Sequence, residues 1–109
     1  MTACEMAKAL SLTPLAVPDA DRDCSGVYIG DLLSWVMGRA GSGNVWITIM
    51  SNINIVAVAS LTDVACIVLA EGVTLDDGVR TTAEQKGVNV YTSEKTAYEL
   101  AAKLASILK

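Results

Sequence analysis

The glycine-rich stretch MGRAGSGNVWITIM, residues 37–50, is the part of the sequence closest to a phosphate-binding loop. Such a loop joins a strand to a helix, and a lysine followed by Ser or Thr comes directly after its last glycine. Gly38 and Gly43 have the required spacing, but Asn44 and Val45 occupy the positions of that lysine and hydroxyl residue. The glycines also precede a β-branched run instead of following one. We therefore interpret them as a turn that ends a helix and connects it to a strand.

Acidic residues alternate along a short polar segment, where Asp19, Asp21 and Asp23 have the spacing of the first ligands in a calcium loop. A calcium loop also needs glycine at its sixth position and glutamate at its twelfth. Cys24 and Gly30 occupy those positions here. We therefore predict a solvated acidic turn and no metal site.

Nucleophilic catalysis lacks its usual base, because the chain contains no histidine to activate a serine or a cysteine. Lysine or carboxylate bases stay open as alternatives, but no spacing singles one out. Cys4, Cys24 and Cys66 are far apart in the sequence and form no CxxC pair. We expect free thiols in a reducing compartment, with Cys66 packed as a small hydrophobic residue. The sequence thus predicts no catalytic residue, no metal and no cofactor.

The composition is that of one globular domain spanning residues 1–109, with 52% hydrophobic and only 18% charged residues. A charged fraction below the usual quarter indicates that a partner covers some apolar surface. The net charge of −4 disfavours nucleic acid as a partner, and no basic amphipathic stretch is present to bind an anionic membrane. Polar residues interrupt both the N-terminal segment and the most apolar stretch, residues 53–70, so we expect a cytoplasmic protein.

The apolar periodicity predicts helices and strands that alternate along the chain. The predicted helices cover residues 4–12, 32–37, 52–62, 75–86 and 94–109, and the predicted strands cover residues 13–17, 24–29, 45–50, 65–70 and 88–91. We expect Asp31 and Ser93 to cap the helices that follow them, and Gly87 to end the fourth helix. The back half has the order β-α-β-α-β-α, which predicts an α/β fold with a small, mostly parallel sheet and helices packed on it.

Residues 52–62 are ambiguous, because the sequence NINIVAVASLT alternates at its start and is rich in β-branched residues, as a strand would be. The strands on either side are predicted to be parallel, and parallel strands need a crossover that is usually helical. These residues are the only ones available for that crossover. We therefore predict a helix, with Ser51 or Asn52 as its cap and Asp63 at its end.

Hydrogen-bonding side chains follow each predicted parallel strand. Because the carboxyl ends of parallel strands meet at one edge of an open sheet, where helix N-termini also point, ligands collect there. Such residues either hold a small polar ligand or a partner loop, or they only cap the helices. We favour the interpretation that they cap the helices. The residues predicted at this edge are Gly30, Asp31, Ser51, Asn52, Asn54, Glu71, Gly72, Thr74, Thr92 and Ser93.

Aromatic residues are few, and Tyr28, Trp35 and Trp46 either stack on a ligand or belong to the core or an interface. In a domain of this size the second alternative is the more common one. Because the segment 32–37 is largely apolar, we assign Trp35, Val36 and Met37 to a contact surface.

The stretches GDLLSWVMGRA, residues 30–40, and NINIVAVASLTDVACIVLAEG, residues 52–72, resemble the DRTGG domain, and most closely its small stand-alone bacterial version. The resemblance continues through the last helix and covers nearly the whole chain. It implies an α/β domain similar to the N-terminal domain of HPr kinase/phosphorylase, without the catalytic P-loop domain of that enzyme. Related domains accompany CBS domains in regulatory pyrophosphatases and are commonly dimeric. Residues 70–72, Ala-Glu-Gly, stand at the position of the TGG motif.

Together these features predict a regulatory or protein-interaction module that is not an enzyme, forms a homodimer and acts with a larger enzyme or signalling protein. A second hypothesis is a small-ligand sensor that binds a nucleotide or phosphorylated metabolite at the carboxyl edge of the sheet. A kinase-like or phosphatase-like enzyme is the least favoured alternative.

Overall fold

The computed structural model describes residues 1–108, which form five helices and one five-stranded sheet. The helices are α1 (Ala3–Leu10), α2 (Leu33–Arg39), α3 (Asn54–Thr62), α4 (Asp77–Lys86) and α5 (Ala97–Ile107). The strands are β1 (Thr13–Ala16), β2 (Val27–Ile29), β3 (Val45–Thr48), β4 (Cys66–Leu69) and β5 (Val90–Thr92). The predicted α/β class is confirmed. None of the helices within residues 1–108 is long and apolar enough to cross a membrane.

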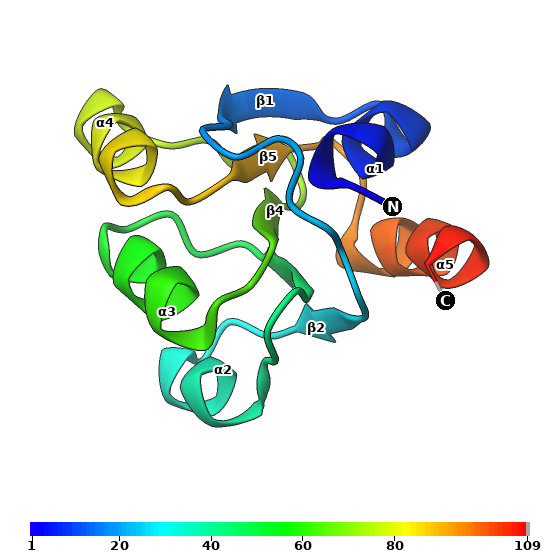
Figure 1. Cartoon of the computed structure of the whole chain (residues 1–109), viewed down its shortest axis with the longest axis horizontal. Helices are drawn as coiled ribbons and strands as arrows, with labels where there is room; N and C mark the ends of the chain where they lie inside the picture. The colour runs from blue at the N-terminus through cyan, green and yellow to red at the C-terminus, as the bar shows by residue number, and fades with distance from the viewer. Residues whose placement is uncertain (109) are drawn as a thin grey trace.

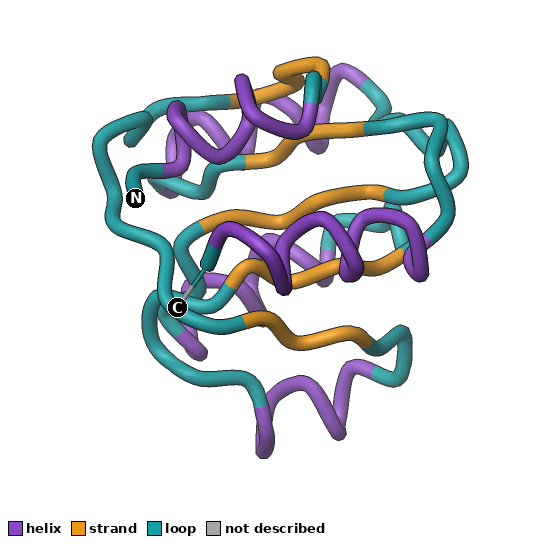
Figure 2. Tube along the Cα trace, turned by 90° about the vertical axis from the view of Figure 1, so that its right-hand side faces the viewer, coloured by secondary structure: helices purple, strands orange, loops and turns teal. Residues whose placement is uncertain are grey.

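The sheet has the strand order β1-β5-β4-β3-β2, so β1 and β2 lie at its two opposite edges. Strands β2 to β5 are parallel, and Ile47 of β3 lies between Ile29 of β2 and Val68 of β4. Strand β1 pairs antiparallel with β5, and Thr13 is opposite Thr92. Figure 2 shows the five strands stacked in one layer. The mostly parallel sheet was predicted from the sequence, whereas the antiparallel edge position of β1 was not.

Helices cover both faces of the sheet because its central strands are apolar on both sides. All residues of β3 and β4 are buried, and successive side chains of a strand point to opposite faces. Helices α1 and α5 pack on one face through residues such as Met6 and Leu104. Helices α2, α3 and α4 pack on the other face, where Val36 and Ile55 are fully buried. Figure 1 shows these two groups of helices on opposite sides of the strands.

The ambiguous segment between β3 and β4 is helical, as the topology predicted, and forms α3. Its Ile55, Val56 and Val58 are buried against the sheet, so the β-branched residues serve the core while the backbone makes the crossover. The helix ends at Asp63, whose backbone is left-handed with φ 59°. Local β propensity is therefore outweighed by the need to connect two parallel strands on one face.

The glycine-rich stretch is a connector from α2 to β3, as predicted, although α2 continues through Gly38 to Arg39. Gly43 has a left-handed backbone with φ 81°, which favours glycine. The Asn44 side chain holds the turn, because its Oδ1 accepts from the Gly41 N–H at 2.7 Å and its Nδ2 donates to the Ser25 carbonyl at 2.8 Å. Both polar groups of the Asn44 side chain are therefore engaged within the protein.

Three predicted helix caps are wrong. Neither Ser51 nor Asn52 caps α3, whose N-cap is Ile53. Asp31 does not cap α2, which begins after Leu32 without a side-chain cap, because the Asp31 carboxylate binds groups at the end of β3 instead. Ser93 does not cap α5 either. The helix begins later, at Thr96, whose hydroxyl accepts from the Glu99 N–H, while the Glu99 carboxylate accepts from the Thr96 N–H.

The side chains of Asn89 and Arg22 tie the acidic segment after β1 to the rest of the fold. The buried Asn89 side chain donates to the carbonyls of Asp19 and Ala65 and accepts from the Asp19 N–H. Arg22 forms an ion pair with Asp63, with 2.9 Å between Nη1 and Oδ1, and this pair lowers the pKa of Asp63. Asp19, Asp21 and Asp23 are themselves exposed, in keeping with a solvated turn.

The position of the α5 cap is testable by two matched substitutions. We expect Thr96→Ala to lower the free energy of unfolding by about 1 kcal/mol, because it removes an N-cap hydrogen bond. Ser93→Ala should cost less than half as much, since its hydroxyl only accepts from the Lys95 N–H in the preceding turn. Urea unfolding followed by circular dichroism measures both, and a larger loss for Ser93→Ala would contradict the assignment.

Candidate functional site

The carboxyl ends of the four parallel strands lie together at one end of the sheet, as the sequence predicted. We call this end the carboxyl edge, which is different from the lateral edges formed by strands β1 and β2. The β2–α2 loop contributes Gly30 and Asp31 to this edge, and the β3–α3 loop contributes residues 49–53. The β4–α4 loop begins with Glu71 and Gly72. The β5–α5 loop begins with Ser93. The predicted site residues therefore come from four loops that share one edge, and their contacts decide what that edge can bind.

Asp31 joins the first two of these loops. Its Oδ1 accepts from the Thr48 hydroxyl at 2.8 Å and from the Ile49 N–H at 3.0 Å. Trp46 reinforces the same connection, because its fully buried indole donates from Nε1 to the Gly30 carbonyl at 2.9 Å. Thr48 is buried, so its contact with a carboxylate stabilises the loops and is closed to a substrate.

The β4–α4 and β5–α5 loops are joined through their backbones. The Glu71 N–H donates to the Lys95 carbonyl, and the Gly72 N–H donates to the Ser93 carbonyl. The hydroxyl of Thr92 is buried and donates to the Val73 carbonyl at 2.6 Å. The structure thus brings Glu71, Gly72, Thr92 and Ser93 together, but much of their hydrogen-bonding capacity is used within the loops.

Glu94 lies over Gly72 and leaves little room there. A Cβ on Gly72 would come within 2.7 Å of the Glu94 carboxylate, and the backbone of Gly72 is left-handed with φ 75°. The carboxylates of Glu71 and Glu94 make this part of the edge acidic, with Lys95 as the neighbouring cation. A polyanionic ligand would need these carboxylates to move.

Ser51, Asn52 and Asn54 lie in the β3–α3 loop and the first turn of α3. The Asn52 Oδ1 accepts from the Asn54 N–H at 2.9 Å, so this side chain folds back on its own segment. The predicted capping of α3 by Ser51 or Asn52 is wrong, because Ile53 is the N-cap and no side chain caps this helix. Asn52 and Asn54 are exposed, and Ser51 is half-buried. Thr74 is exposed in the β4–α4 loop.

Two of the three residues predicted for a contact surface are exposed. Trp35 and Met37 are each about half exposed, at 53% and 51%. Val36 is fully buried under α2, so its assignment to a contact surface is wrong, because a helix that packs on a sheet must turn one residue of each turn inward. The guanidinium of Arg39 stacks on Trp35, 3.8 Å from the ring centroid, and fixes this side chain on the helix surface.

A groove of about 320 Å³ lies between α3 and α4 on the same face of the sheet as α2. Ile53, which precedes α3, and Val56 and Leu61 of α3 form its apolar wall, and Thr82 and Lys86 of α4 face them. This groove was not predicted from the sequence.

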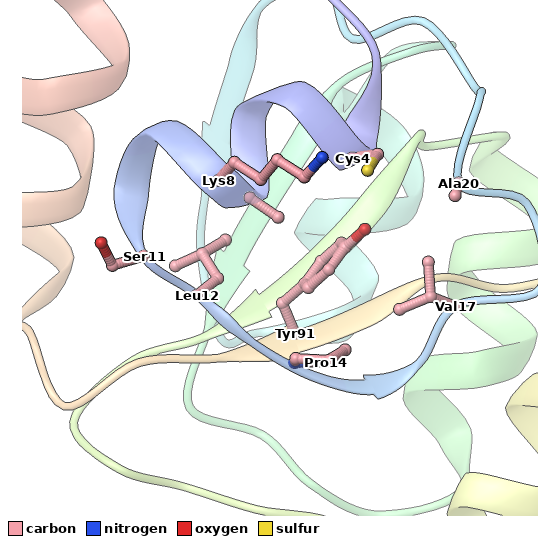
Figure 3. Close-up of a pocket in the computed structure, with 9 residues that line it drawn as sticks. Cys4, Lys8, Ser11, Leu12, Pro14, Val17, Ala20 and Tyr91 are labelled. Atoms are coloured by element: carbon pink, nitrogen blue, oxygen red, sulfur yellow. The ribbon is translucent and has the colours of Figure 1, made fainter.

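A second hollow, of about 290 Å³, lies between α1 and β1 on the opposite face of the sheet. Figure 3 shows Tyr91 of β5 at its centre, with its hydroxyl directed toward Cys4 and the Lys8 side chain extended along the helix above. We call it the α1 pocket; it is lined by Cys4, Ala7, Lys8, Ser11, Leu12, Pro14, Val17, Ala20 and Tyr91. The sequence does not reveal this pocket, because its walls include Val17 and Ala20 from the loop after β1.

The Tyr91 side chain is only 3% exposed, yet its hydroxyl makes no hydrogen bond within residues 1–108. Within the described residues, every polar side-chain atom without solvent-accessible surface has a hydrogen-bond partner. The unpaired Tyr91 hydroxyl must therefore be solvent-accessible, and it is accessible through the α1 pocket. Burial, together with the nearby thiols of Cys66 and Cys4, raises the pKa of Tyr91 to about 12. The phenol therefore stays protonated and remains a hydrogen-bond donor at ordinary pH.

The cysteines of the described chain are free thiols, as expected. Cys66 is buried in the core between the sheet and α1, which confirms its prediction as a small hydrophobic residue. A hydrogen bond between the thiols of Cys24 and Cys66 lowers the pKa of Cys24. The same contact and burial raise the pKa of Cys66, so this thiol stays protonated and unreactive. Residues 1–108 contain no group of three or more Cys, Asp or Glu placed to hold a metal ion.

No protein-family model matches the chain, and no curated protein matches its sequence. A solved structure does match it, with a TM-score of 0.75 and 12% sequence identity. That structure contains the CBS and DRTGG domains of the regulatory region of Clostridium perfringens pyrophosphatase, complexed with its activator, diadenosine tetraphosphate. The fold is DRTGG-like. The match covers 98% of this chain and 47% of the other, so this chain spans about half the length of its structural neighbour.

The raised pKa of Tyr91 predicts a pH dependence of stability. Folding favours the neutral phenol, so this contribution is complete below pH 10, the ordinary value, and decreases as the pH rises toward about 12. We expect the difference in unfolding free energy between the wild type and Tyr91→Phe to fall between pH 8 and pH 11. Urea unfolding of both proteins measures it, and a constant difference would contradict the burial of this hydroxyl.

Proposed function

We propose that the chain is a regulatory module that has no catalytic chemistry of its own, self-associates and acts with a larger enzyme or signalling protein. The observation that carries this proposal is the similarity of fold, over nearly the whole chain, to part of a regulatory region that accompanies an enzyme. The contacts at the carboxyl edge support it, because Asp31, Thr48 and Thr92 use their polar groups to join loops.

The surface for self-association is the β2–α2 edge, which we define by Ile29, Leu32, Trp35 and Met37. These residues are 50%, 60%, 53% and 51% exposed, which are high values for large apolar residues close together in one segment. Strand β2 lies at the edge of the sheet, where its outer backbone groups can pair with another chain. In the proposed dimer, a second copy lies against the outer side of β2 and covers apolar side chains of this segment.

Trp35→Glu tests this surface. Large aromatic side chains dominate many interfaces, so we expect the dimer dissociation constant to rise at least tenfold. Analytical ultracentrifugation over a micromolar to high-micromolar range measures the constant. Tyr98→Glu is the matched control, because Tyr98 is 81% exposed on α5, on the other face of the sheet, and should leave the dimer intact.

Two results would contradict self-association through the β2–α2 edge. One is a strict monomer for the wild type at several hundred micromolar. The other is equal weakening by the two substitutions, which would place the interface elsewhere. Circular dichroism of each variant checks that the fold is retained.

A nucleotide sensor is the second candidate, and the activator bound to the structural neighbour favours it. Diadenosine tetraphosphate and ATP would bind at the carboxyl edge, where the exposed Asn52 and Asn54 and the half-buried Ser51 and Ser93 offer hydrogen bonds. At a hundred times its Kd, a ligand stabilises the fold by about 2.7 kcal/mol, which raises the melting temperature by several degrees. A thermal-shift experiment should show this rise, and Asn52→Ala should reduce it. An unchanged melting temperature with both nucleotides would reject the sensor.

A further inference from the structure

We propose that the α1 pocket binds a small aromatic or branched aliphatic monocarboxylate, whose apolar body fills the pocket and whose carboxylate accepts hydrogen bonds from Tyr91 and Lys8. This site lies at the β1 edge of the sheet, and the proposed self-association surface lies at the opposite, β2 edge. The two proposals can therefore fail independently.

The size and walls of the pocket define the body of the ligand. Ala7, Leu12, Pro14, Val17 and Ala20 present only carbon atoms from their side chains. At about 30 Å³ for each water-sized group, a volume of about 290 Å³ holds roughly ten non-hydrogen atoms. A benzene ring or a branched carbon chain with one polar group is of this size.

The unpaired hydroxyl of Tyr91 defines the polar group. This hydroxyl is accessible from the pocket and is not engaged by the protein, so a ligand that enters must replace the solvent there with an acceptor of its own. Figure 3 places this hydroxyl inside the pocket, on the side of Cys4. Because the phenol stays protonated, the ligand must bring an acceptor such as a carboxylate or carbonyl oxygen.

Lys8 favours a carboxylate over a neutral acceptor. It lines the pocket, and its ammonium forms no ion pair within residues 1–108. In Figure 3 the side chain extends toward the end of the pocket to which the Tyr91 hydroxyl points. Asp19 and Asp21 flank Ala20 in the pocket wall, so a ligand with several negative charges, such as a nucleotide, is disfavoured at this site.

The test is a titration of the whole chain, labelled with nitrogen-15, by heteronuclear NMR. Benzoate is the probe, and benzamide is its uncharged analogue of the same shape. We expect saturable shift changes at the amides of pocket residues, with benzoate bound about tenfold more tightly than benzamide. Tyr91→Phe should weaken both probes by about fivefold, as expected for one hydrogen bond. Lys8→Met should reduce the affinity for benzoate to that for benzamide and leave benzamide unchanged.

A matched pair of substitutions separates the pocket from the rest of the surface. Ala20→Leu adds three carbon atoms to the pocket wall and should abolish binding of both probes. Ala9→Leu makes the same change on an exposed position of α1 outside the pocket and should leave both affinities unchanged. The dispersed amide spectrum of each variant shows directly that it is folded.

Several outcomes would overturn the proposal. Shift changes that do not saturate, or that persist in Ala20→Leu, would show that the pocket is not the site. Equal affinities for benzoate and benzamide in the wild type would remove the role of Lys8 and the choice of a carboxylate. Shift changes at the pocket that depend on protein concentration alone would mean that a second copy of the chain covers it.

Discussion

Every residue of β3 and β4 is buried, so these two strands can exist only between two layers of helices. This double burial determines the rest of the architecture. It requires helical crossovers, it places α1 and α5 on one face and α2, α3 and α4 on the other, and it gathers the loops after four strands at one edge. The surfaces for which we propose functions lie outside these two cores: the polar carboxyl edge, the β2–α2 edge and the α1 pocket.

The polar edge and the α1 pocket differ in how far the chain satisfies its own polar groups. At the carboxyl edge, Asp31, Thr48 and Thr92 have partners within the protein, and backbone hydrogen bonds join the loops that carry Glu71 and Ser93. In the pocket, the Tyr91 hydroxyl has no such partner among the described residues. A concave apolar pocket with one polar group left free by the protein has the usual form of a small-ligand site, and the α1 pocket has this form whereas the polar edge does not.

The sequence allowed the α/β class, the parallel sheet and the helical crossover α3 to be predicted, because periodicity and chain connectivity are properties of whole segments. Caps were harder to predict. Asp31 and Ser93 are good capping residues by type, but Asp31 is drawn to β3 by a hydroxyl 17 residues away, and Thr96 offers a complete capping box three residues after Ser93. The pocket could not be predicted, since it depends on a gap between α1 and a loop that Asn89 holds from the far side of the sequence. The burial of Val36 likewise follows from the orientation of α2 on the sheet, which a seven-residue helix does not reveal by periodicity.

The alternation of side chains along the strands separates the two large buried aromatic residues. Trp46 belongs to the core beneath α2, α3 and α4, whereas Tyr91 belongs to the core beneath α1 and α5. Trp46 and Tyr91 therefore lie in different halves of the molecule. In a variant in which Trp35, Tyr28 and Tyr98 are replaced, emission from the one indole and near-ultraviolet absorption by the one phenol follow the loosening of separate layers, so coincidence of the two signals would establish that both cores melt in one cooperative step.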